Sequence, residues 1–255
     1  MKVRLGLALG MLMAVALAGA AEATVVGNWN GSNRSWNNSD MSALRGAVVA
    51  AGHTVRADAA ITPAELAGDG VFVIGEATVT PSAGEMSDLS GFVNAGGILL
   101  VFTNSSASGV AGANSIFSAL GSTLNFAGTN PVAAPFPAGP FTSGPTNIVG
   151  QTITTSPGNF ISGGTVVAGS FVNYQQIGAG YVIAFGDRID HNVFGPTAGT
   201  PNGDLFLNIL QVAATPQVVV VRHVDVPTLS EWGLIGLAVL VTALAIGGLR
   251  RRKVS

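Results

Sequence analysis

The chain has 255 residues, of which 48% are hydrophobic and only 9% are charged, and its formal net charge at pH 7 is -2. It contains no cysteine, which excludes disulfides, thiolate metal sites and thiol nucleophiles. Between Thr24 and Val226 there are five arginines, no lysine and eleven acidic residues, a formal charge of about -6. A surface this acidic repels phosphate backbones, so nucleic acid is not an expected partner.

The first residues have the layout of a cleaved secretory signal. A basic head, KVR, precedes an apolar run over residues 5–17, and Ala21 and Ala23 frame a small-x-small cleavage site. We therefore predict that residues 1–23 are a signal peptide, which directs the chain to the export machinery and is removed by signal peptidase, so that the mature chain begins at Thr24. A retained signal anchor is the alternative, but the apolar run is short for a membrane span.

Strands and helices are predicted to alternate after this signal. The β-rich run VVGNW and a polar loop are followed by a helix over residues 41–51 that ends at Gly52. The stretch TVRAD is predicted to be a second strand. Thr62 and Glu65 have the spacing of a capping box, with a proline at the first helical position, which predicts a short helix to residue 67.

Two continuous apolar runs, VFVI at 71–74 and ILLVF at 98–102, are typical of strands that helices bury on both faces. Between them, Ser82 and Glu85 form a second capping box that begins a helix ending at the glycine pair NAGG. A further helix is predicted around residues 114–120.

The regular pattern then fails. The segment 127–145 is rich in proline and glycine without periodicity, which predicts a long irregular loop or insertion, with edge hairpins as an alternative. Order returns at 165–172, the stretch AGYVIAFGD is predicted to be one more buried strand, and residues 204–212 are predicted to be a helix.

Two-sided apolar strands that alternate with amphipathic helices predict an α/β fold: a three-layer sandwich with a mostly parallel sheet. About two hundred residues are enough for one domain, which we place at 24–214, followed by a linker at 215–225.

The C-terminal segment is predicted to span a membrane. No charged side chain occurs from Trp232 to Leu249, and a helix of that length rises about 27 Å, close to the roughly 30 Å of a bilayer's hydrocarbon core. Four cations follow directly: Arg250, Arg251, Arg252 and Lys253. The positive-inside rule places such a cluster on the cytoplasmic side, so the body is predicted to lie outside.

The tail, residues 226–255, resembles the IPTL-CTERM protein-sorting signal, with valine where that family usually has isoleucine. The resemblance is carried by Val226, Pro227, Thr228, Leu229, Trp232 and Gly233, followed by the span and the basic cluster. It implies recognition by an exosortase-type membrane protease of a Gram-negative bacterium. The precursor would be anchored in the inner membrane, and the product would reach the cell envelope or surface, or be secreted. A permanent single-span anchor is the alternative.

The body is similar to the class I glutamine amidotransferase-like fold, a flavodoxin-like sandwich. The stretches that carry this resemblance are DGVFVIGEA, NAGG before ILLVFTNSS, and GAGYVIAFGDRIDHN ahead of GDLFLNIL. Enzymes of that family place a nucleophilic cysteine on the sharp turn after the strand that ends here at Phe102. In this chain the turn reads TNSS, so the resemblance implies a body without that family's reaction.

Three polar residues follow the last predicted strand, at the sheet edge where open α/β folds usually bind ligands. They are Asp187, Asp190 and His191. One hypothesis makes His191 a base for Ser105 or Ser106, oriented by a carboxylate; another makes the three residues metal ligands. The alternative is that they terminate the strand and cap a neighbouring loop, and we predict no metal site.

Two further features bear on binding. Glu76 follows a strand that ends at the same sheet edge as Asn104, and it is expected to join a polar pocket with Asp187. Trp29 and Trp36 either stack on sugar rings, as aromatic platforms do, or one of them packs over the end of the sheet.

These observations predict an exported cell-envelope protein that acts without catalysis and without a cofactor. Its body is predicted to be a surface or extracellular-matrix binding or structural module, associated with exopolysaccharide because sorting systems of this type accompany it. The alternative is a secreted serine hydrolase that uses Ser105 or Ser106 with His191. A hydrolase requires a serine oxygen within hydrogen-bond reach of the imidazole.

Overall fold

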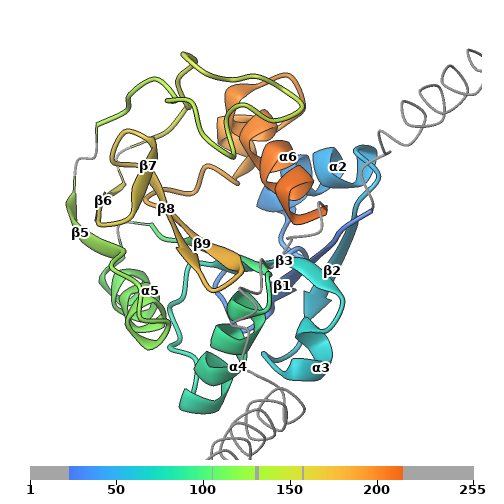
Figure 1. Cartoon of the computed structure of the whole chain (residues 1–255), viewed down its shortest axis with the longest axis vertical. Coiled ribbons are helices and arrows are strands. Elements are labelled where there is room, and N and C mark those ends of the chain that lie inside the picture. Colours follow the sequence, from blue (N-terminus) through green and yellow to red (C-terminus); the bar gives the residue numbers. More distant parts are fainter. Residues whose placement is uncertain (1–22, 105, 130–131, 157, 215–255) are drawn as a thin grey trace, which may run out of the picture. The chain divides into compact units, whose positions relative to one another are not determined.

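The computed structural model describes residues 23–104, 106–129, 132–156 and 158–214. They form an α/β fold around a seven-stranded, mainly parallel sheet of order β2-β1-β3-β4-β9-β8-β7 (Figure 1). The predicted α/β class and the mostly parallel sheet are thereby confirmed. The predicted signal peptide, linker and membrane helix lie outside the described residues. Within the described residues, no helix combines the length and the apolar character that crossing a membrane requires.

Five neighbouring strands of this sheet are parallel. They are β2 (Thr54–Asp58), β1 (Val25–Trp29), β3 (Asp69–Gly75), β4 (Ile98–Phe102) and β9 (Gly180–Phe185). All five residues of β4 are buried, as the continuous apolar run predicts for a strand with helices on both faces.

Helices cover both faces of the sheet, in two sets. One face carries α2 (Ser42–Ala50) and α6 (Pro201–Ala214); the other carries α3 (Pro63–Leu66), α4 (Ala83–Asn94) and α5 (Ala107–Ala119) (Figure 1). Each layer closes its own hydrophobic core against the sheet. On the α6 side, the rings of Phe102 and Phe185 stack with their centroids 4.3 Å apart, and both contact Phe206.

The two predicted capping boxes form to different extents. The Ser82 hydroxyl accepts from the backbone N–H of Glu85, and the Glu85 carboxylate accepts from the backbone N–H of Ser82, a complete capping box. At α3, the Thr62 hydroxyl accepts from the backbone N–H of Glu65, but the Glu65 carboxylate accepts from Ala60 instead. The second box is therefore half formed.

Helix α5 begins earlier than the predicted 114–120, because Ser106 caps its N-terminus. Its first turns are rich in small residues, which pack closely against the segment that follows β3. A Cβ on Gly112 would stand 2.0 Å from the carbonyl oxygen of Ala77. Close packing of glycine and alanine leaves no stripe of large apolar residues, so the periodicity does not reveal these turns.

The region after α5 contains antiparallel strands. A hairpin of β7 (Thr165–Ala168) and β8 (Val172–Ile177) continues the main sheet beyond β9, while β5 (Asn125–Thr129) and β6 (Asn159–Ser162) form a separate two-stranded sheet. The regular segment predicted at 165–172 thus consists of strand β7 and the turn that leads into β8. The described residues between β5 and β6 form neither helix nor strand, in agreement with the predicted irregular segment.

Buried asparagines of α6 hold this irregular segment in place. The Asn208 side-chain amide donates to the carbonyl oxygens of Phe141 and Thr146 at 3.1 and 2.9 Å. The Asn202 side chain donates to the Thr154 carbonyl and accepts from its backbone N–H, at 2.7 and 2.9 Å. Side-chain amides therefore satisfy backbone groups that no strand or helix would satisfy.

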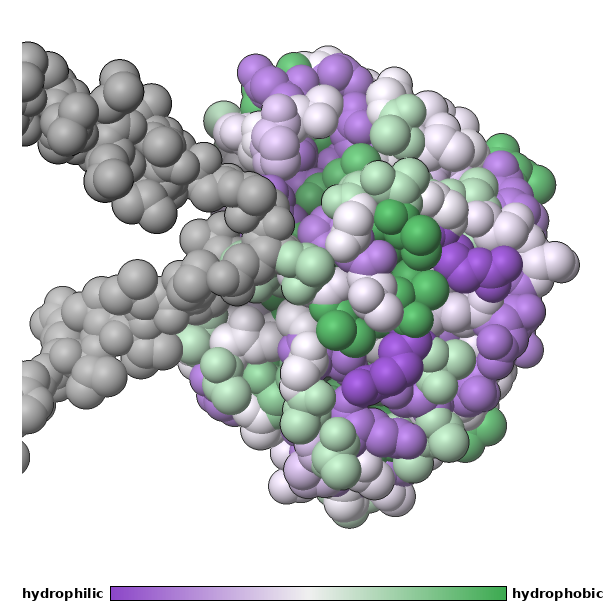
Figure 2. Space-filling view, turned by 90° about the vertical axis from the view of Figure 1, so that its right-hand side faces the viewer, coloured by the Kyte–Doolittle hydropathy of each residue, from purple (hydrophilic) through white to green (hydrophobic). Residues whose placement is uncertain are grey.

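The molecule exposes few large hydrophobic side chains, and they are scattered. On the side that carries α2, β2 and α3, hydrophobic residues lie among strongly hydrophilic ones (Figure 2). Val49 on α2 and Val193 near the C-terminal end of β9 are exposed, at 53% and 68%. Single exposed valines of this kind are ordinary on a folded domain and indicate no function.

Gly27 in β1 offers a test of the packing between strands. A Cβ there would stand 2.2 Å from Asp69 Oδ2, 2.6 Å from Asp58 Oδ2 and 2.8 Å from the Phe72 ring. We expect Gly27→Ala to lower the free energy of unfolding by about 1–3 kcal/mol, measured by urea denaturation. Gly46→Ala in α2, where nothing lies within 4 Å, is the matched control and should raise it by about 0.5–1 kcal/mol. Equal effects would contradict this account.

Candidate functional site

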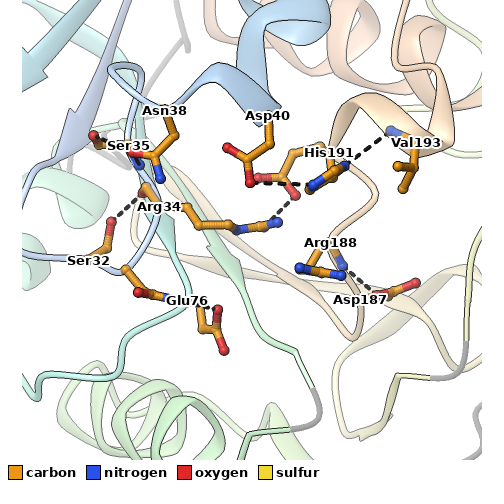
Figure 3. A network of polar contacts seen from close by, with 12 residues as sticks. Ser32, Arg34, Ser35, Asn38, Asp40, Glu76, Asp187, Arg188, His191 and Val193 are labelled. Atoms are coloured by element: carbon orange, nitrogen blue, oxygen red, sulfur yellow. Dashed lines mark hydrogen bonds and ion pairs between the residues drawn. The ribbon is translucent and has the colours of Figure 1, made fainter.

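The candidate site lies where the strand order reverses direction. Strand β1 has β2 on one side and β3 on the other, and open α/β sheets bind ligands beyond the carboxyl ends of the strands at such a point. The loop after β1 contacts the end of β3, because Arg34 N donates to Gly75 O at 3.0 Å and Asn33 N donates to Glu76 O at 3.1 Å. The polar residues gathered here form what we call the carboxyl-edge network (Figure 3): Arg34, Asp40, Glu76, Arg188, Asp190 and His191.

A buried ion pair lies at the centre of this network. Arg34 and Asp190 are 3% and 0% exposed, and Arg34 Nη2 donates to Asp190 Oδ1 at 2.5 Å. Burial raises the pKa of the Asp190 carboxyl, while the Arg34 guanidinium opposes that rise. Among the described residues, Arg34 Nε, Arg34 Nη1 and Asp190 Oδ2 are buried without a hydrogen-bond partner. The pair is therefore only partly satisfied by the protein.

Glu76 is strained. With φ at +63°, it is the one non-glycine residue in the described part of the chain whose φ is positive. Its Oε1 accepts from the Ser106 hydroxyl at 2.7 Å and its Oε2 accepts from the Asn33 amide at 3.0 Å. The side chain thus contacts Asn33 and Ser106, whereas the Asp187 carboxylate, with which we expected it to share a pocket, binds elsewhere. Strain of this kind often marks a functional site.

His191 caps a short helix and contacts a carboxylate. Its Nδ1 accepts from the backbone N–H of Val193 at 3.1 Å, at the start of the 3-10 helix η2 (Asn192–Phe194). Its Nε2 lies 3.4 Å from Asp40 Oδ2. Both ring nitrogens therefore have partners other than Ser106.

Asp187 organises a neighbouring loop. Its Oδ2 accepts from the Thr155 hydroxyl at 2.7 Å and from the backbone N–H and hydroxyl of Ser156 at 2.7 and 2.9 Å. Its Oδ1 accepts from the backbone N–H of Arg188 at 2.7 Å. The carboxylate is thus occupied in holding the segment before β6, and it does not orient the imidazole of His191.

The three residues singled out after the last strand consequently do not act as one group. Asp187 binds the 155–156 loop, Asp190 binds an arginine, and His191 faces Asp40. The Ser106 hydroxyl donates to the Glu76 carboxylate. Ser105 lies outside the described residues. In the part of the chain that is described, no three His, Asp or Glu side chains are placed to hold a metal ion.

Both tryptophans, Trp29 at the end of β1 and Trp36 in the loop that follows, are buried. Trp29 and Trp36 are 5% and 3% exposed, and the Trp36 indole donates to Val26 O at 3.1 Å. The packing interpretation is confirmed, and neither ring offers a face to a sugar. The same loop supplies Arg34 and Asp40, which the sequence reasoning missed. The available signal was an arginine directly after the first strand in a body with very few cations.

A second charged cluster lies over Gly27 of β1, between β2 and β3. Arg56 binds Asp58 and Asp69 at 2.5 and 3.0 Å; its side chain is 38% exposed, whereas the carboxylates are 2% and 0% exposed. Burial raises the pKa of Asp69 to about 7, and it also raises the pKa of Asp58, although Arg56 opposes both shifts. Two poorly solvated carboxyl groups therefore share one guanidinium.

Removing one member of the buried pair in the carboxyl-edge network should be costly. Arg34→Ala leaves Asp190 buried without its cation, and we expect the free energy of unfolding to fall by about 3–5 kcal/mol. Replacing both residues, with Arg34→Met and Asp190→Leu, removes both charges and should cost less. Urea denaturation measures both variants. A double variant less stable than the single one would contradict the assigned pairing.

The Asp58 and Asp69 cluster predicts a pH dependence of stability. The pKa of Asp69 is about 7 in the folded chain, compared with an ordinary aspartate value of 3.8 in the unfolded chain, so the folded state binds the proton more tightly. The free energy of unfolding should therefore fall as pH rises from about 4 to about 7 and level off above. Asp58 shifts in the same direction. Urea midpoints at about pH 5 and about pH 8 measure this difference, and Asp69→Asn should reduce it. A wild-type midpoint that is higher at pH 8 would contradict the assignment.

Comparison with known proteins finds one motif and a shared fold. Residues 226–252 match the IPTL-CTERM motif, so the chain carries a C-terminal sorting motif of exported surface proteins. No curated protein matches the chain.

Two solved structures share the fold at low sequence identity. The mmIFT52 N-terminal domain aligns with a TM-score of 0.61 and 11% identity over 76% of this chain and 99% of that one. A β-galactosidase from Rahnella sp. R3 aligns with a TM-score of 0.53 and 15% identity over 85% of this chain, which corresponds to 36% of that enzyme. At these identities the likeness extends to the arrangement of strands and helices alone.

Proposed function

We propose that the chain is an exported cell-envelope protein whose body is a non-catalytic binding or structural module and whose tail directs its sorting. The observation that carries this proposal is the IPTL-CTERM motif at 226–252. The motif implies processing by an exosortase-type membrane protease. An inner-membrane-anchored precursor would thus yield a product at the cell surface, in the extracellular matrix or in the medium.

In this proposal the chain has four parts. Residues 1–23 are a signal peptide cut by signal peptidase, 24–214 form the body, 215–225 are a linker, and 226–255 are the sorting tail with its membrane helix. For the body we propose a flavodoxin-like sandwich of the amidotransferase type. The order of the parallel strands, β2-β1-β3-β4 followed by β9, supports this, since it is the flavodoxin order.

The absence of catalysis is part of the proposal and has support in the carboxyl-edge network. The Ser106 hydroxyl donates to Glu76, and both His191 nitrogens face other groups, so the two residues do not form a nucleophile and base pair. This geometry disfavours a secreted serine hydrolase that uses Ser106 with His191; the version that uses Ser105 stays the alternative function. A binding module needs no such pair, and a strained, polar edge at the reversal of strand order suits ligand binding. Exopolysaccharide is the partner we propose for it.

The test is intact mass and terminal sequencing of the protein from its native host, fractionated into membrane, surface and medium. We expect a chain that begins near Thr24 and ends near Pro227, Thr228 or Leu229. Retention of the basic cluster after Leu249 in every fraction would show a plain anchor and contradict the sorting proposal.

A motif variant sharpens this experiment. Pro227→Ala changes the sorting motif but leaves the apolar segment 232–249 intact, so the uncut precursor should accumulate in the membrane fraction. Val219→Ala, in the proposed linker, is the control and should be processed like the wild type. Equal processing of both variants would show that the motif does not direct cleavage.

A further inference from the structure

The carboxyl-edge network contains buried N–H donors that no described residue accepts. Arg34 uses Nη2 to bind Asp190, while its Nε and Nη1 are buried without a partner among the described residues. Buried donors in folded proteins are nearly always paired, with protein, ordered water or ligand. Arg34 therefore presents two donor atoms to an acceptor that the described protein does not supply.

Arg188 adds a second guanidinium with free donors. Its backbone N–H binds Asp187, but no hydrogen bond or ion pair within the described residues involves its guanidinium, and its Nε is buried without a partner. The guanidinium points to the side of the network on which Arg34 and Glu76 lie (Figure 3). Every other described arginine has an acceptor: Asp190 for Arg34, the Trp36 carbonyl for Arg45, and Asp58 and Asp69 for Arg56.

The neighbouring carboxylates already have donors, which limits their repulsion of an anion. Glu76 accepts from Asn33 and Ser106, Asp187 accepts from the 155–156 loop, and one oxygen of Asp40 faces His191. The unpaired acceptors of the network are one oxygen each of Asp40 and Asp190. Unpaired N–H groups of two guanidinium groups outnumber them, so the missing partner is rich in acceptors.

We infer that the carboxyl-edge network binds a carboxylate group of a ligand, held by the guanidinium groups of Arg188 and Arg34. A guanidinium presents a planar fork of N–H donors that matches the two oxygens of a carboxylate. Arg188 is partly exposed and meets the ligand from solvent, whereas Arg34 is buried and supplies the two unpaired donors Nε and Nη1. This inference rests on the proposed binding function and names the chemistry of its ligand.

The rim of the network indicates what else the ligand carries. The loop after β1, which carries Arg34, exposes Asn30, Asn33 and Asn37; the Asn33 amide donates to Glu76 and the Asn37 amide donates to Asn30, which leaves the Asn30 amide N–H groups and the Asn33 and Asn37 amide oxygens for a ligand. Amide groups both donate and accept hydrogen bonds, which suits the hydroxyl groups of a saccharide. The ligand we assign is therefore a carboxylated saccharide, and an acidic peptide is the competing source of the same carboxylate.

The test is isothermal titration calorimetry on the full chain in detergent micelles, with three probes: a galacturonate trisaccharide, a neutral galactose trisaccharide and an acidic tripeptide. We expect the galacturonate to bind, with an affinity that falls as salt rises, and the other two to bind about tenfold more weakly or not at all. Arg188→Gln should weaken galacturonate binding by about tenfold or more.

Arg45→Gln is the matched control, because it removes the same charge from an arginine outside the network and should leave the affinity unchanged within about twofold. Unchanged binding by Arg188→Gln, or no galacturonate binding at all, overturns the site. Equal binding of the neutral sugar overturns the carboxylate, and tighter binding of the tripeptide overturns the saccharide. These outcomes leave terminal processing untouched, so the proposed sorting function stands or falls separately.

Discussion

Burial of the parallel strands on both faces is the constraint on which the rest of the structure depends. The chain has no cysteine, so packing supplies the stability of its body. Helices on both faces of β3 and β4 leave no solvent at the centre of these strands, and their side chains there are apolar. Between Val71 and Phe102 these two strands contribute only apolar side chains and glycine, and the carboxyl-edge network lies beyond their carboxyl ends.

The network itself is held by backbone geometry as much as by charge. The loop after β1 is fixed to the end of β3 by two backbone hydrogen bonds, and this contact places Arg34 beside Asp190. Glu76, directly after β3, adopts a strained backbone conformation with positive φ. Backbone strain and unpaired buried donors both cost free energy, which the packing of the surrounding sheet offsets. Proteins tolerate such costs mainly at ligand-binding and catalytic sites.

Local chemistry in the sequence was sufficient to predict part of this structure. Ser82 and Glu85 predict the start of α4 because both partners of the capping box lie within one turn. The α5 start was missed because close packing of glycines depends on Ala77, which belongs to another segment. The network was missed for the same reason: Arg34 and Asp190 are 156 residues apart in the chain, and no local pattern relates them. The residues grouped by proximity, Asp187 to His191, instead point to different partners.

Helix α6 has a consequence for the order in which the body can fold. It is the last described element, yet its Phe206 packs on rings of β4 and β9, and its asparagines hold the irregular segment between β5 and β6. Helix α2 already covers part of this face, but a chain that emerges N-terminus first leaves the part over Phe102 and Phe185 open until the fourteen residues of α6 have appeared. The core on this face is therefore complete only when residues from both ends of the described body are present.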